Sequence, residues 1–152
     1  MTTTTAPTTV RPSLRHPAVA GALGLGTYAA AMAAGEAFDL NADTGGNGTS
    51  AGEWAVTGLI ALAGLAIGVA VGLRGWAGPP TRLARIALGL AIVSAVLFVA
   101  FWSGWPSIFS AVAVGLAVEH GRRIGSFGPA TGIAAGLGTV AFAAMAFLCV
   151  TG

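Results

Sequence analysis

Only a few residues of this chain carry side chains that could perform acid–base or ion-binding chemistry. Glu119 and His120 are adjacent near the end of an apolar stretch, and Arg122 and Arg123 follow them. A carboxylate that lies inside hydrocarbon is a candidate for proton or cation coupling, and His120 could relay protons near neutral pH. The alternative interpretation is an ion pair between Glu119 and the arginines three and four residues later.

A second polar group follows one face of the first apolar stretch. Tyr28, Met32, Gly35, Glu36 and Asp39 recur at spacings of one helical turn, so a helix places them on one side. Glu36 and Asp39 together offer oxygen ligands for a cation, or an entry point for protons, if they face a cavity or water. Alternatively, Glu36 lies at the level of the lipid headgroups.

The polar segment after this stretch contains alternating oxygen-bearing side chains. Asp39, Asn41 and Asp43 resemble the start of a calcium-binding loop, because hard cations prefer such ligands. The pattern then departs from an EF-hand: Thr44 stands where glycine is needed, and Ser50 where the bidentate glutamate belongs. A loop built from Asx turns accounts for the same residues. No cofactor is predicted.

The composition requires a membrane. Of the 152 residues, 55% are hydrophobic and only 8% are charged, whereas soluble domains carry about 25% charged residues. A surface with so few charges must face lipid. The seven arginines are dispersed along the chain and there is no lysine, so a nucleic-acid-binding stripe is not expected. The expected location is the cell membrane, as a multi-pass protein.

The predicted fold is an all-α integral membrane bundle of five spans. The arginines fall in alternate connections, which places the N-terminus inside and the C-terminus outside. Residues 1–16 are expected to be a disordered cytoplasmic tail, and residues 17–152 one transmembrane domain with an outer loop over 39–52. A capping box is expected at Ser50 and Glu53. The spans are expected at about 18–38, 53–73, 83–102, 106–120 and 129–150.

The first span has a second interpretation. A basic start, an apolar core and Ala31-Met32-Ala33 also resemble a signal peptide with its cleavage site.

Two rows of glycine mark surfaces for close helix packing. Each row has a spacing of four residues, which places its members on one helical face. Missing side chains let a neighbouring helix approach closely in lipid, so self-association or another membrane protein is an expected partner. The rows are Gly64, Gly68 and Gly72 in the second span, and Gly128, Gly132 and Gly136 in the fifth.

These features favour an oligomeric channel or transporter for a small ion or a proton-coupled solute. Glu119, His120, Glu36, Asp39 and Tyr28 are its coupling candidates. The alternative is a non-catalytic accessory or scaffold subunit of a larger membrane complex. An intramembrane enzyme that uses Glu119 with His120, or Glu36 with Asp39, ranks third, because these pairs lie near the ends of the expected spans.

Overall fold

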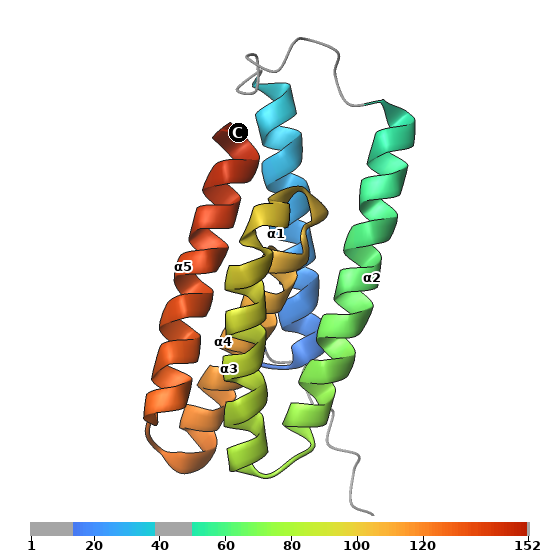
Figure 1. Ribbon diagram of the computed structural model, residues 1–152. Coiled ribbons are helices and arrows are strands. Elements are labelled where there is room, and N and C mark those ends of the chain that lie inside the picture. The colour runs from blue at the N-terminus through green and yellow to red at the C-terminus, as the bar shows by residue number, and fades with distance from the viewer. Residues whose placement is uncertain (1–13, 39–49, 152) are drawn as a thin grey trace, which may run out of the picture.

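The computed structural model describes residues 14–38 and 50–151, and every regular element in them is helical (Figure 1). Consecutive α-helices run in opposite directions along the bundle (Figure 1). The elements are α1 (Pro17–Ala37), α2 (Ala51–Trp76), α3 (Pro80–Val96), the 3-10 helix η2 (Leu97–Ser103), α4 (Trp105–Ile124) and α5 (Pro129–Thr151).

Four described segments are long and apolar enough to cross a bilayer. They are α1, α2, α5 and the continuous stretch Pro80–Ser103. Their outer faces expose large apolar side chains, such as Leu59 on α2 and Val140 on α5. Apolar surface of this extent belongs against lipid or another protein. The helices therefore support an integral membrane protein, as the composition predicts.

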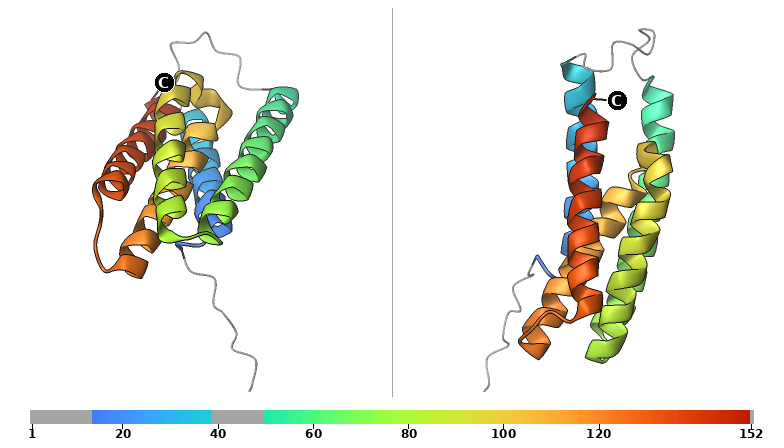
Figure 2. Two further views of the ribbon diagram at one scale, coloured as in Figure 1. Left: turned by 60° about the horizontal axis from the view of Figure 1, so that its bottom comes forward. Right: turned by 60° about the vertical axis from the view of Figure 1, so that its left-hand side comes forward.

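Helix α4 occupies the centre of the bundle. It contacts α1, α2, α3 and α5, and Figure 2 shows it passing between them. Twelve of its 20 residues are buried. The expected fourth span covered 106–120, but the helix continues through Arg122 and Arg123 and ends at Gly125, which has φ 81°. Glycine adopts this left-handed conformation without steric cost.

The third predicted span is less regular than its hydrophobicity suggested. Its α-helix ends at Val96, and η2 follows with a non-helical residue, Ala100, at φ −106° and ψ 41°. Gly104 then turns the chain at φ 73°. In Figure 1 this turn lies short of the upper ends of α1 and α2. Hydrophobicity alone could not reveal the change of helix type, because the mean hydropathy of a segment does not depend on the number of residues per helical turn.

The glycine row of α2 faces the inner helix. A Cβ atom built on Gly64 would lie 2.5 Å from Trp105 Cδ1, and one on Gly68 would lie 2.9 Å from Phe109 Cδ1. A Cβ on Gly72 would lie 2.8 Å from both Pro17 and Val112. Side chains of neighbouring elements therefore occupy the space that these glycines leave.

The glycine row of α5 lies on a different face. Gly132 and Gly136 are exposed, and a Cβ on either would have no described atom within 4 Å. The inward face instead contains Ala134, Gly138 and Ala141. Gly138 is the close contact, since a Cβ there would lie 2.9 Å from Val114.

The start of α2 and the charged end of the bundle follow the sequence closely. The capping box is confirmed: the Ser50 amide donates to Glu53 Oε2 at 2.7 Å, and the Glu53 amide donates to Ser50 Oγ at 3.3 Å. The described arginines all lie near helix ends that gather at the bottom of Figure 1. They are Arg15, Arg74, Arg82, Arg85, Arg122 and Arg123.

Candidate functional site

A buried carboxylate at the charged end of α4 binds several guanidinium groups. Glu119 is 2% exposed. Arg122 donates to both of its oxygens, from Nε at 2.9 Å and from Nη2 at 2.8 Å. Arg123 Nε donates to Oε1 at 2.8 Å, and Arg15 Nη1 lies 3.9 Å from Oε2. The ion pairs at spacings of three and four are therefore present, and a third arginine approaches from the segment before α1.

Arg123 connects this cluster to the end of α2. Its Nη2 donates to the Trp76 carbonyl at 3.0 Å and its Nη1 to the Gly78 carbonyl at 3.4 Å. Its guanidinium carbon also lies 5.3 Å from the centre of the Trp76 ring, a cation–π geometry. The same ring meets the His16 ring edge-on at 5.5 Å. The cluster thus ties together the start of α1, the end of α2 and the end of α4.

His120 lies next to the carboxylate but outside its hydrogen bonds. Its Nδ1 atom is buried and has no hydrogen-bond partner in the described part of the chain. A buried polar atom without a partner is uncommon in folded proteins.

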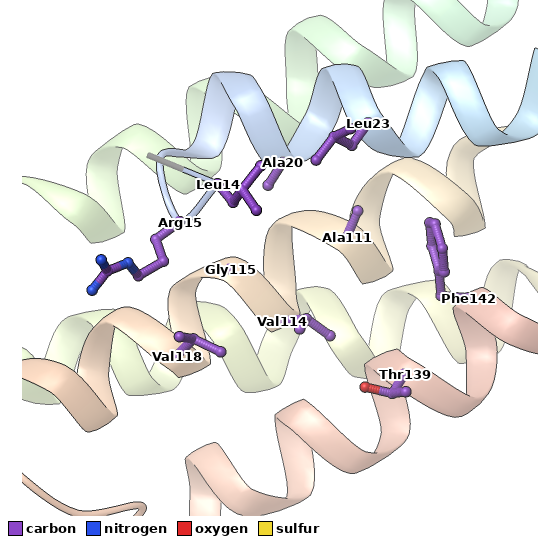
Figure 3. Close-up of a pocket in the computed structure, with 10 residues that line it drawn as sticks. All are labelled: Leu14, Arg15, Ala20, Leu23, Ala111, Val114, Gly115, Val118, Thr139 and Phe142. Carbon is purple, nitrogen blue, oxygen red and sulfur yellow. The ribbon is translucent and has the colours of Figure 1, made fainter. Parts of the chain in front are cut away.

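A groove of about 570 Å³ runs along α4 between α1 and α5. Figure 3 shows its walls: α1 and the segment before it contribute one side, α5 the other, and α4 the floor. Its lining is apolar apart from Arg15 and Thr139. The lining residues are Leu14, Arg15, Ala20, Leu23, Ala111, Val114, Gly115, Val118, Thr139 and Phe142.

The groove is bounded differently at its two ends. Toward the later turns of α1 and α5, Tyr28 and Ala31 pack in one buried cluster with Met145 and Cys149. Toward the charged end the two helices diverge (Figure 1), and Arg15 lies there with its guanidinium turned away from the apolar lining (Figure 3). The groove therefore leads from a closed apolar end to a cationic one.

The other predicted polar residues do not join this site. The Tyr28 hydroxyl donates to the Trp102 carbonyl, which links α1 to η2. Glu36 is exposed and accepts a hydrogen bond from Trp54 Nε1 at 3.2 Å. Both contacts lie away from the end of α4 that carries Glu119. The proposed ligands Asp39, Asn41 and Asp43 lie outside the described residues.

Two features of the site had no separate signal in the sequence. Arg15 was interpreted only as a marker of topology, although it lines the groove and approaches Glu119. Trp105 packs inside the bundle: its indole N–H donates to the Ile60 carbonyl at 2.7 Å and its ring covers Gly64. Both depend on contacts between distant segments.

The chain matches no protein-family model, and no curated protein or solved structure is detectably similar to it. The groove and the arginine–glutamate cluster are the candidate functional features of the described residues.

Proposed function

We propose that this protein is a non-catalytic membrane protein that binds the apolar chain of an amphiphilic molecule in the groove between α1 and α5. The observation that supports this proposal is the groove itself. Its volume of about 570 Å³ lies within the range of roughly 300–1,000 Å³ that is usual for ligand pockets. Leu23 and Val118 line it and are exposed, so a chain can enter sideways from the bilayer.

Tight packing on both sides of α4 supports a groove that exists before its ligand arrives. A Cβ on Gly24 of α1 would lie 2.7 Å from the Ile108 Cα, so these two backbones are in close contact. Ser107 Oγ donates to the Gly24 carbonyl at 2.8 Å across the same interface. On the other side, Gly138 of α5 meets Val114. Both walls are therefore anchored to the floor, and a preformed site binds without a large ordering cost.

Photocrosslinking in vesicles tests the proposal. Phosphatidylcholine that carries a diazirine in one acyl chain should label Val114, Val118 or Phe142 more strongly than Val140, an exposed residue outside the groove. Val118→Trp should reduce this labelling several-fold by filling the groove, whereas the matched variant Val140→Trp should leave it unchanged. Equal labelling of the groove residues and Val140 in the native protein would show that the groove binds lipid no more strongly than the rest of the apolar surface, and would contradict the proposal.

A proton-coupled transporter or oligomeric channel is a second candidate. The observation that favours it is His120 Nδ1, which is buried without a described partner beside the buried Glu119. In sealed liposomes this function requires a pH-dependent flux that Glu119→Gln abolishes while the protein remains folded. Flux that stays pH-dependent in this variant would remove Glu119 from the mechanism.

The size of the protein in detergent separates a channel from an accessory subunit. A self-assembled oligomer favours a channel, whereas a monomer that co-purifies with another protein favours an accessory subunit.

A further inference from the structure

Arg15 is the one charged residue in the lining of the groove, and its hydrogen-bond donors are not used within the described part of the chain. Its side chain is 38% exposed. Glu119 Oε2 lies 3.9 Å from its Nη1, beyond the usual hydrogen-bond distance. Arg15 can therefore donate to an acceptor on a molecule that occupies the groove.

The cluster around Arg15 has an excess of positive charge. Arg15, Arg122 and Arg123 share the single carboxylate of Glu119, so three positive charges face one negative charge and the net charge is +2. The two Nη atoms of Arg123 donate hydrogen bonds to the backbone carbonyls of Gly78 and Trp76. Arg122 is 59% exposed, which leaves it accessible to an anion together with Arg15.

Arg122 also continues the floor of the groove. Ala111, Gly115 and Val118 line the groove from α4, and Arg122 follows Val118 by four residues. Residues at these spacings lie on the same helical face. At 1.5 Å per residue, Arg122 lies about 6 Å beyond Val118 along the helix. An apolar chain on the floor would thus end close to two guanidinium groups.

An apolar groove cannot by itself select a ligand inside a bilayer, because lipid tails are as apolar as the side chains that line it. Selection must come from the charged end, and guanidinium groups match phosphate oxygens in geometry and charge. We propose that the groove binds one anionic phospholipid, with an acyl chain along Ala20, Val114 and Val118 and the headgroup phosphate at Arg15 and Arg122. This inference rests on the proposed function and adds the headgroup to it.

The headgroup is tested with two photoactivatable lipids that share the same acyl chain. Phosphatidylglycerol and phosphatidylcholine compete for the native protein in mixed vesicles, and phosphatidylglycerol should label Val118 about tenfold more. Both headgroups contain a phosphate, so the preference is expected from their net charge: the three arginines around Glu119 attract the net negative charge of phosphatidylglycerol, whereas the quaternary ammonium of phosphatidylcholine cancels the charge of its phosphate. Arg15→Gln should remove the preference while keeping the labelling by phosphatidylcholine, and Arg15→Lys should restore part of it. Folding is expected to survive, since Arg122 and Arg123 still hold Glu119.

Arg85→Gln is the matched control, because it removes an exposed arginine of α3 at the same end of the bundle. It should leave the preference unchanged; an equal loss in this variant would assign the preference to general surface charge and overturn the site. Equal labelling by both lipids in the native groove would overturn the headgroup assignment alone. Labelling of the groove by neither lipid would overturn the proposed function as well. Loss of labelling on addition of inorganic phosphate would indicate a site for a free anion instead.

Discussion

At the scale of single residues, Glu119 connects the parts of the bundle that carry charge. Its two oxygens receive three hydrogen bonds from Arg122 and Arg123, and Arg15 lies nearby. A buried carboxylate is costly unless such partners compensate for the lost water. The arginines remain partly exposed, so they lose less hydration than the carboxylate does. This arrangement suits a fixed structural charge that holds the cationic end of the groove.

The first prediction concerns Glu119→Gln. The neutral amide keeps the shape of the side chain, but its NH₂ group faces guanidinium donors that it cannot satisfy. We expect the free energy of unfolding to fall by about 1–3 kcal/mol, the range for hydrogen bonds to charged groups. The measurement is the thermal midpoint in detergent, with Arg85→Gln as the control that should change little. Equal midpoints for Glu119→Gln and the native protein would show that the ion pairs do not contribute to stability.

The residue-level predictions succeeded where the partners were close in sequence. Arg122 and Arg123 follow Glu119 by three and four residues, so helical geometry alone brings them together. Arg15 comes from a segment more than 100 residues away, and no local spacing predicts that contact. Trp105 shows the same difference: an aromatic residue beside a turn is typical of the membrane interface, but Gly64 provides a surface for it inside the bundle.

At the scale of elements, the two glycine rows occupy different environments. The row on α2 packs against side chains of α4, whereas Gly132 and Gly136 on α5 face outward. Sequence spacing could identify both rows but not their orientation. Which face turns inward depends on the whole set of helix contacts, and on α5 the face of Ala134 and Gly138 takes that place. The outward row is therefore the one that a second membrane protein could reach.

The second prediction compares Gly68→Leu with Gly136→Leu. At Gly68 even a Cβ would lie 2.9 Å from the Phe109 ring, so leucine must displace α4 or its side chains. Overpacking of this kind costs about 1–3 kcal/mol, and the thermal midpoint in detergent should fall. Gly136→Leu adds the same side chain where no described atom lies within 4 Å, and the midpoint of the monomer should stay the same. A lowered midpoint only in the second variant would contradict this assignment of the two faces.

Gly136→Leu also reports on self-association. If the outward row of α5 packs against a second copy, this variant should lose an oligomer that size measurement detects for the native protein. Gly68→Leu should then lower the thermal midpoint through packing within one chain, because Gly68 does not lie on the outward glycine row of α5. The two variants together separate packing inside one chain from packing between chains.

At the scale of the whole molecule, the hairpin formed by α3 and α4 places the least hydrophobic of the described α-helices, α4, inside more hydrophobic ones. α4 is buried on most sides and carries the internal hydrogen bonds of Ser107 and Ser110. Hydrophobicity predicted five helical stretches, because turn residues or arginines separate them, but only four described segments are long and apolar enough to cross a bilayer, and α4 is not among them. It could not identify α4 as the central helix, since burial in protein and burial in lipid select similar side chains.

The last prediction concerns how the bundle lies across the membrane. Every described arginine lies near the end of the molecule where α1, α3 and α5 begin, and positively charged connections stay on the cytoplasmic side. Single cysteines, introduced in a Cys149→Ser background, should therefore label from opposite sides of sealed membranes. Ala77→Cys and Ser126→Cys should react only with reagent that reaches the cytoplasm. Asn47→Cys, in the predicted outer loop over 39–52, should react from the exterior. Labelling of Asn47→Cys and Ala77→Cys from the same side would show that α2 does not cross the membrane and would overturn the five-span topology.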